Sequence, residues 1–161
     1  MDEFGRCNIT FARLSDISPD EILVHMSDPR VTKHMPLLTT KWDHHIVAEF
    51  VAAKEACWRR DGLGHWAILW SDEYVGWGGF QREGDEWDFG LVLTSDSFGL
   101  GARIAKKAIK FAVTDERIPH VTFLLPLSRK YLGGLSRLGA WFVEEIEYDG
   151  AQFLKYRLDT E

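Results

Sequence analysis

The sequence lacks the features that would point to a disulfide framework, a metal centre or a nucleic-acid partner. It has only two cysteines, Cys7 and Cys57, which lie far apart and without the spacing of metal ligands. We expect both to be buried free thiols in a reducing compartment. A basic surplus is also missing, because 25 acidic side chains outnumber 19 basic ones and give a net charge of −6. This balance argues against nucleic acid as a partner and favours cationic or neutral partners such as amines.

Long hydrophobic runs and low-complexity segments are missing as well. No apolar stretch approaches the roughly 20 residues that cross a bilayer. The first ten residues, MDEFGRCNIT, are acidic and have no apolar run of the kind found in signal peptides. We therefore expect no membrane partner and a cytoplasmic location. With 161 residues, 45% of them hydrophobic and 27% charged, the chain is expected to form one domain over residues 1–161.

The spacing of apolar residues predicts strands and helices in the order β-α-α-β-β-β-α-β-α-β-β. The strands over 65–70, 74–81 and 87–93 are joined by short turns and should form an antiparallel meander. A strand–helix–strand unit over 87–126 predicts one parallel pair within an otherwise antiparallel sheet, which makes the fold α+β. The other expected elements are a strand at 7–14, helices at 18–28, 41–62, 100–116 and 128–140, an irregular segment at 29–38, and a closing hairpin over 141–158 that turns at Asp149 and Gly150.

Two glycines, Gly99 and Gly101, stand where the strand 87–93 gives way to the helix 100–116. A dinucleotide fingerprint would need a third glycine where the chain has Ile104, and a phosphate-binding P-loop would end in Lys-Ser or Lys-Thr, which is missing. The junction still suits an anion, because a helix N-terminus offers N–H groups and positive partial charge, and glycine removes side chains that would crowd the ligand. The alternative is a capped helix with a solvated lysine face.

A family resemblance accounts for this junction together with its surroundings. The stretches WAILWSDEYVGWGGFQ, DFGLVLTSDSFGLGARIAKKAIKFA and LSRLGAWFVEEIEYDGAQFLKYRL resemble the GNAT superfamily of acyl-CoA-dependent N-acetyltransferases, in the right order and spacing. The early segment MSDPRVTKHMP is similar to the Rim-type branch, the ribosomal-protein N-terminal acetyltransferases. The resemblance covers about residues 8–158. It implies a mixed, mostly antiparallel sheet of six to seven strands, with helices on both faces and a V-shaped splay between the central strands.

The resemblance also implies acetyl-CoA as co-substrate, and it assigns residues to that ligand. In the family the strand before the glycines pairs its backbone with the pantetheine arm, and the loop with the helix start holds the pyrophosphate. Asp96 stands where the family usually has Gln or Arg. Pro126 suits a strand that loses its neighbour at the splay, or a strand that simply ends. The implied cofactor-binding residues are Leu91, Val92, Leu93, Phe98, Gly99, Leu100, Gly101, Ala102, Arg103 and Ser128.

Strand alternation singles out the catalytic candidates. It places Glu86 and Asp88 on one face of their strand, opposite the apolar face that begins with Trp87. Acetyl transfer to an amine needs a proton acceptor, and Asp88 also matches the acidic residue that opens this strand in Rim-type relatives. We expect Asp88 to be the general base or amine anchor, with Glu86 as the next candidate; the alternative is that both are solvated. Tyr131 is a candidate proton donor to the leaving thiolate, or else packs or binds the cofactor.

The acceptor amine should be held by His34, Met35, Trp42 and Trp77, and no metal is expected. The implied function is N-acetylation of a primary amine, either a protein N-terminus or a small amine, by direct attack on acetyl-CoA. A non-catalytic acyl-CoA-binding module of the same fold and a plain interaction domain remain alternatives. A homodimer is a common outcome for such folds and stays open.

Overall fold

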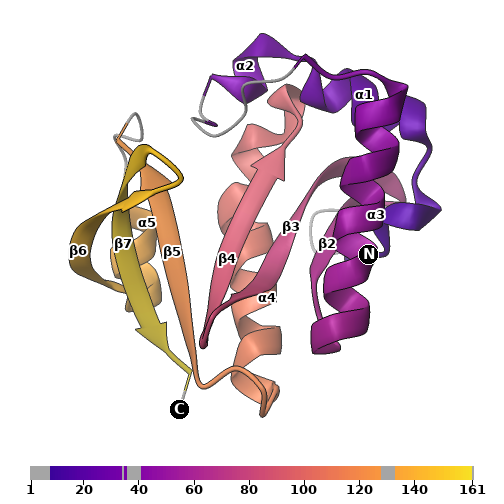
Figure 1. The fold of residues 1–161 in the computed structure, drawn as a ribbon. Helices are drawn as coiled ribbons and strands as arrows, with labels where there is room; N and C mark the ends of the chain where they lie inside the picture. The colour runs from indigo at the N-terminus through magenta and orange to yellow at the C-terminus, as the bar shows by residue number, and fades with distance from the viewer. Residues whose placement is uncertain (1–7, 34, 36–40, 128–132, 161) are drawn as a thin grey trace.

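The computed structural model describes residues 8–33, 35, 41–127 and 133–160 (Figure 1). They contain one seven-stranded sheet with the strand order β1-β2-β3-β4-β5-β7-β6. All neighbouring strands pair antiparallel except β4 and β5, which are parallel. The predicted α+β, mostly antiparallel sheet is confirmed. The strands are β1 Ile9–Ala12, β2 His65–Trp70, β3 Glu73–Glu83, β4 Glu86–Leu93, β5 His120–Pro126, β6 Trp141–Tyr148 and β7 Ala151–Asp159.

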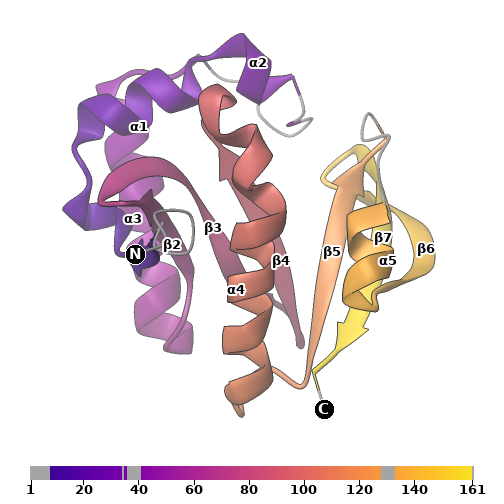
Figure 2. The same ribbon diagram turned by 180° about the vertical axis from the view of Figure 1, so that it is seen from behind.

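Helices cover both faces of the sheet, as Figures 1 and 2 show from opposite sides. The helices α1 and α3 cover one face, where their apolar residues pack around Ala67 and Trp77. The helices α4 and α5 cover the other, which has the largest core cluster around Phe80. The helices are α1 Pro19–Met26, α2 Pro29–Thr32, α3 His44–Asp61, α4 Gly101–Thr114 and α5 Gly133–Leu138, with short 3-10 turns η2 Leu14–Asp16 and η3 Ser95–Leu100.

Local chemistry explains where the helices on the α1 face begin and end. Asp43 caps α3 by accepting a hydrogen bond from the backbone N–H of Ile46 at 2.8 Å. Gly62 ends α3 in the left-handed conformation with φ of 75°. The helix α2 falls in a segment expected to be irregular. It forms because Asp28 accepts from the backbone N–H of Arg30 at 2.9 Å and Pro29 has a helical φ.

The central strands β4 and β5 stay together for only three residue pairs. Trp87 pairs with Val121, Asp88 with Thr122 and Phe89 with Phe123. Beyond Phe89, β4 remains paired with β3 up to Leu93, and β5 remains paired with β7 up to Pro126. The two strands therefore diverge after Phe89, as Figure 1 shows, and the predicted V-shaped splay is confirmed. We call residues 90–93 of β4 and 124–126 of β5 the splay.

Glycines in β3 allow it to lie unusually close to β4. A Cβ on Gly78 would stand 2.3 Å from the carbonyl oxygen of Gly90, so no other residue fits there without moving the backbone. The register between β3 and β4 is unbroken, so Gly78 marks a close approach to β4. On the other side of β3, the register with β2 shifts next to Gly76.

Two further findings concern the sequence predictions on thiols and membranes. Cys57 is a free thiol but is half-buried, so the expectation of full burial was wrong. It lies near the end of α3, beside the exposed Arg60. Cys7 lies outside the described residues. No helix in the described ranges is long and apolar enough to cross a membrane.

Candidate active site

Asp88 lies two residues before the splay, on the face of the sheet opposite the Phe80 core. Its partner across the β4–β5 pairing is Thr122, whose hydroxyl donates to Asp88 Oδ1 at 2.9 Å. The pKa of Asp88 is raised to about 7, mainly by burial. The charges of Glu83 and Glu86 contribute to the rise, whereas the hydrogen bond from Thr122 and the charge of Lys155 act against it. A carboxyl group with this pKa can take up and release protons near neutral pH.

Glu86 is on the same strand and face as Asp88 but has the opposite environment. The ammonium of Lys155 donates to Glu86 Oε1 at 2.7 Å, and His120 Nε2 lies 3.3 Å from Oε2. Partial burial acts to raise the pKa of Glu86, but the contacts with Lys155 and His120 outweigh it and leave the pKa lowered. Glu86 is therefore ionised at neutral pH and held by partners.

A buried polar cluster on the α3 side of the sheet was missed by the sequence analysis. Lys54 Nζ lies 2.9 Å from His65 Nδ1 and donates to Gln81 Oε1 at 2.9 Å. Burial lowers the pKa of Lys54 to about 8. Burial also lowers the pKa of His65 well below its ordinary value, and the nearby Lys54 charge adds to this. The ring of His65 is therefore neutral, and when Nδ1 accepts from Lys54, Nε2 carries the ring proton.

The position of His65 connects this cluster to the splay. A Cβ built on Gly90 would lie 3.6 Å from His65 Nε2, so the imidazole reaches the first residue of the splay. The sequence signal was weak, because a histidine opening a strand and a lysine within a helix are ordinary features on their own. Only the pairing of His65 with Gly79, and of Gly79 with Gly90, brings the ring to this place.

Tyr148 and Glu83 border the same face. The Tyr148 hydroxyl donates to Glu83 Oε2 at 3.5 Å. The Glu83 charge is the largest of the causes that raise the pKa of Tyr148, and Asp88 also contributes. In the sequence, Tyr148 stood out only as the residue before the Asp149-Gly150 turn, which is confirmed by φ values of 50° and 85°. Thr122 was missed for the same reason, since it reads as an ordinary strand residue.

The loop before α4 has the geometry of an open anion cradle. A Cβ on Gly99 would meet no atom within 4 Å, and one on Gly101 would meet only Leu93 Cδ1 at 3.8 Å. Neither glycine has a positive φ. The fold itself therefore does not require glycine at either position. Leu100 is the N-cap residue of α4, and among the described residues no side chain caps this helix start. The backbone N–H of Gly101 donates to the carbonyl of Phe98, and a helix N-terminus of this kind favours a nearby anion.

The side chains around this loop turn away from the splay. Leu91 and Leu93 pack in the core cluster around Ile104, which leaves their backbone as the part that faces the splay. The Arg103 guanidinium lies 5.8 Å from the centroid of the Trp70 ring. The Lys107 ammonium donates to the backbone carbonyl of Ile9. These contacts direct the Arg103 and Lys107 side chains toward Trp70 and β1.

Of the four residues predicted to hold the acceptor, Met35, Trp42 and Trp77 are among the described residues. Met35 and Trp42 pack against the core cluster of α1 and α3, and the buried Nε1 of Trp42 has no hydrogen-bond partner among the described residues. Trp77 is only 7% exposed and its Nε1 lies 3.3 Å from Met26 Sδ. Trp77 also lies beneath the Lys54 ammonium, 4.9 Å from its ring centroid. His34, Ser128 and Tyr131 lie outside the described residues, so their roles stay predictions.

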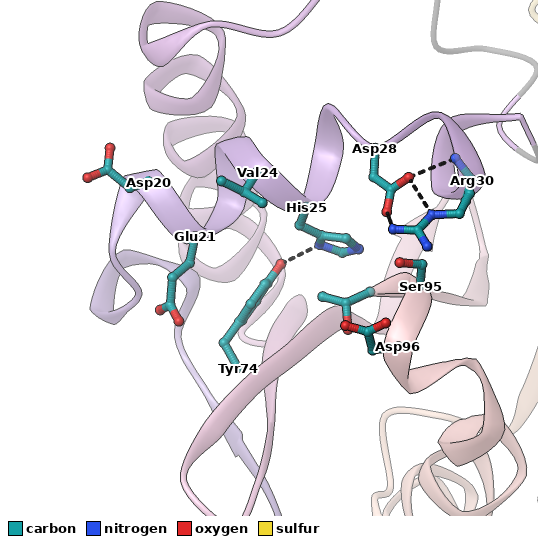
Figure 3. Close-up of a pocket in the computed structure, with 10 residues that line it drawn as sticks. Asp20, Glu21, Val24, His25, Asp28, Arg30, Tyr74, Ser95 and Asp96 are labelled. Atoms are coloured by element: carbon teal, nitrogen blue, oxygen red, sulfur yellow. Dashed lines mark hydrogen bonds and ion pairs between the residues drawn. The ribbon is translucent and has the colours of Figure 1, made fainter.

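Asp96, which departed from the family pattern, does not lie on the splay. It lines a separate groove with residues of α1 and α2, shown in Figure 3. Its charge helps to raise the pKa of Arg30 there, after the larger effect of Asp28.

Comparison with known proteins supports the reading of this geometry. The acetyltransferase (GNAT) domain family matches residues 9–125, which is more than half of the chain. No curated protein matches the sequence.

Several solved acetyltransferases share the fold. An acetyltransferase from Agrobacterium tumefaciens is 18% identical, with a TM-score of 0.72 and coverage of 95% of this chain and 92% of that one. The Campylobacter jejuni N-acetyltransferase PseH, solved with acetyl coenzyme A, is 15% identical, with a TM-score of 0.69 and coverage of 96% and 100%. RimL, a ribosomal L7/L12 alpha-N-protein acetyltransferase solved with coenzyme A, is 11% identical, with a TM-score of 0.74 and coverage of 94% and 93%. At these identities the likeness shows the fold.

Proposed function

Because this chain belongs to the GNAT acetyltransferase family, whose co-substrate is acetyl-CoA, we propose that it transfers the acetyl group to a primary amine by direct attack. The proposal rests on Asp88. Its pKa is about 7, and it belongs to the second of the three residue pairs that join β4 and β5 before the strands diverge. The amine nitrogen forms a bond to the thioester carbonyl carbon, the carbon–sulfur bond breaks, and the products are an amide and the free thiol of coenzyme A.

Asp88 is the group that we propose to take the proton from the amine. A protein α-amine has an ordinary pKa near 7.7–8.0, so much of it is protonated at neutral pH and it cannot attack until it loses a proton. A base works best when its pKa is near the working pH. The ion pair of Glu86 with Lys155 keeps the pKa of Glu86 low, which makes Glu86 the weaker base.

The proposed binding of acetyl-CoA uses backbone rather than side chains. The β5-facing edge of β4 is unpaired along the splay, so the backbone of residues 91–93 is available to the pantetheine arm. The open positions at Gly99 and Gly101 then leave room for the pyrophosphate beside the start of α4. His65 Nε2, beside Gly90, adds a donor at the start of the splay.

The acceptor is proposed to be a protein N-terminus or a small amine. Residues 26–36 resemble the Rim-type branch. The chain also shares its fold with RimL, which acetylates a protein N-terminus, and both likenesses support a protein N-terminus as the acceptor. The acidic residues Glu83 and Glu86 beside Asp88 favour a cationic acceptor over an anionic one. The half-buried free thiol of Cys57 suits a reducing, cytoplasmic compartment.

The proposal is tested by release of free thiol from acetyl-CoA in the presence of an amine panel. The panel should contain peptides with different N-terminal residues, diamines and aminoglycosides, and calorimetry should measure acetyl-CoA binding in parallel. We expect binding and amine-dependent thiol release. If acetyl-CoA binds but no amine in the panel accelerates thiol release, the chain is a non-catalytic acyl-CoA-binding module. If acetyl-CoA does not bind, both readings are wrong.

A further inference from the structure

Lys54 of α3 is a partly buried cation that no carboxylate neutralises by direct contact. Among the described residues none of the ion pairs includes its ammonium. The ammonium instead contacts His65 Nδ1 and Gln81 Oε1, each at 2.9 Å, and lies 4.9 Å from the centroid of the Trp77 ring. Burial lowers the pKa of Lys54 to about 8, so the ammonium form prevails at neutral pH but costs folding stability. A cation retained at such a cost needs a role other than stabilising the fold.

The contact with Lys54 decides which nitrogen of His65 carries the ring proton. An ammonium group has donors only, so Nδ1 of His65 has to accept from it at neutral pH. Burial and the Lys54 charge lower the pKa of His65, so the ring is neutral and its single proton is on Nε2. Gln81 holds the ammonium in place, and its own amide nitrogen donates to Glu83 Oε1 at 3.1 Å. Burial alone would keep the ring neutral, whereas Lys54 also selects the tautomer.

The Nε2 edge of the His65 ring lies at the first residue of the splay. His65 pairs with Gly79 and Gly79 pairs with Gly90, so the ring reaches across β3 to β4. A Cβ built on Gly90 would stand 3.6 Å from Nε2 and 3.7 Å from Cε1. Gly90 is half-buried and has no positive φ, so the backbone does not require glycine there.

Because residue 90 is glycine, no side chain at this position covers the Nε2 edge of His65. Asp88 is two residues earlier on the same strand and therefore on the same face. The splay thus begins with an N–H donor and a proton acceptor on one face of the sheet. Such a pair suits a reaction in which an amine loses a proton while a carbonyl oxygen gains negative charge.

We propose that Lys54 is a positioning residue, whose ammonium holds His65 in the tautomer that directs its Nε2–H at the thioester carbonyl oxygen of acetyl-CoA. This inference rests on the proposed function. Negative charge develops on that oxygen when the amine attacks, and a donor fixed beforehand stabilises it. His65 transfers no proton, because its hydrogen bond only strengthens as the charge develops and weakens when the carbon–sulfur bond breaks. Lys54 acts through His65 and contacts neither substrate.

Nitrogen NMR of histidine-labelled protein at pH 7, without acetyl-CoA, tests the tautomer directly. The signals of His65 are assigned by their absence in His65→Gln. We expect a protonated Nε2 and an unprotonated Nδ1 in the unsubstituted protein. Lys54→Met removes the donor but keeps most of the side-chain volume, so the His65 signals should move to those of mixed tautomers. The matched control Lys110→Met, at an exposed lysine, should leave them unchanged. A proton on Nδ1 in the unsubstituted protein, or an unchanged tautomer in Lys54→Met, overturns the proposal.

A double-mutant cycle tests the catalytic consequence. Lys54→Met should lower kcat at least about tenfold, while the Kd for acetyl-CoA stays within about twofold and Tm does not fall, because the buried charge is gone. His65→Gln keeps an N–H donor of similar reach but has no tautomers. Adding Lys54→Met to His65→Gln should therefore lower kcat no further. An equal loss of kcat in both backgrounds would show that Lys54 does not act through His65.

The outcomes distinguish this inference from the proposed function. If no amine releases thiol from acetyl-CoA, the proposed function fails, and the catalytic role of Lys54 falls with it whatever the tautomer of His65. If the unsubstituted protein acetylates an amine and Lys54→Met retains full kcat, only the inference about Lys54 is wrong.

Discussion

Asp88 beside the splay, and Glu21 and Asp96 in the groove shown in Figure 3, are carboxylates whose environments differ in kind. Asp88 is half-buried beside Glu83 and Glu86, and its pKa is raised to about 7. Glu21 and Asp96 are exposed at the surface. Burial favours the neutral acid, whereas exposure leaves a carboxylate ionised and able only to attract. The contrast teaches that the same functional group is suited to proton transfer in one place and only to charge attraction in the other, according to how much water reaches it.

The largest effect is expected when the carboxylate of Asp88 is removed. Asp88→Asn keeps the shape and the Thr122 contact but cannot accept a proton, so kcat/KM for the amine should fall at least about 100-fold. Acetyl-CoA affinity, measured by calorimetry, should stay within about twofold. The matched control Glu116→Gln removes an exposed carboxylate and should have no effect. Retention of full kcat/KM in Asp88→Asn between pH 6 and 9 would remove Asp88 from the mechanism.

Stability as a function of pH separates the two carboxylate environments directly. The pKa of Asp88 is raised from 3.8 to about 7 by folding, so its ionisation costs stability as pH rises between these values. Asp88→Asn should therefore stabilise the protein at pH 8 relative to the unsubstituted chain, by up to about 4 kcal/mol, with the advantage disappearing below about pH 4.

Glu21→Gln supplies the contrast for this measurement. Since Glu21 is exposed, its substitution should change the free energy of unfolding by less than about 0.5 kcal/mol at either pH. Urea denaturation at pH 4.5 and 8 measures both variants. Equal responses of Asp88→Asn and Glu21→Gln to pH would show that the two environments do not differ.

A smaller effect is expected at the loop before α4. Gly99→Val places a side chain where the protein itself has no atom within 4 Å, so Tm should hardly change. The KM for acetyl-CoA should rise about tenfold if the pyrophosphate lies there, a difference of about 1.4 kcal/mol. Gly78→Ala is the control with the opposite expectation. The alanine Cβ would stand 2.3 Å from the carbonyl oxygen of Gly90, so this substitution should lower Tm. An unchanged KM in Gly99→Val would place the cofactor elsewhere.

The smallest effect is expected from the hydroxyl of Thr122, which influences the pKa of Asp88. The hydrogen bond from Thr122 lowers the pKa of Asp88, so Thr122→Val should raise it. Because the ionised form is the base, the rise of kcat/KM with pH should then move to higher pH, by about one unit. The pH profile of thiol release measures this. A simple fall in kcat/KM at every pH would indicate only a packing defect, and the tuning role would be wrong.

Much of the fold was predictable because its signals are local. The helix α3 has a capping aspartate, a helical apolar stripe and a terminal glycine, and the meander has short turns. The segment around Pro29 was predicted to be irregular, since a four-residue helix is too short to produce a periodic pattern. The splay was expected mainly through family resemblance. Pro126 at the end of β5 was compatible with a strand that loses a neighbour, but equally with a strand that simply ends.

The site was predictable only in part, since its key contacts join residues far apart in the chain. Asp88 could be selected by strand alternation and resemblance. Its Thr122 partner, and the pairing of Lys54 with His65, depend on strand register and helix placement. The position of Asp96 in the groove with residues of α1 and α2 was likewise not predictable from the sequence, in which Asp96 was only a departure from the family pattern.

The central claim is that Asp88 changes protonation near neutral pH. Carbon NMR of protein labelled at aspartate side-chain carboxyl carbons, with Asp88 assigned by comparison with Asp88→Asn, follows this titration directly. The account predicts a midpoint for Asp88 at about pH 7, well above that of an ordinary aspartate. A midpoint near pH 4 would show that Asp88 is an ordinary solvated carboxylate and would contradict its role as the base.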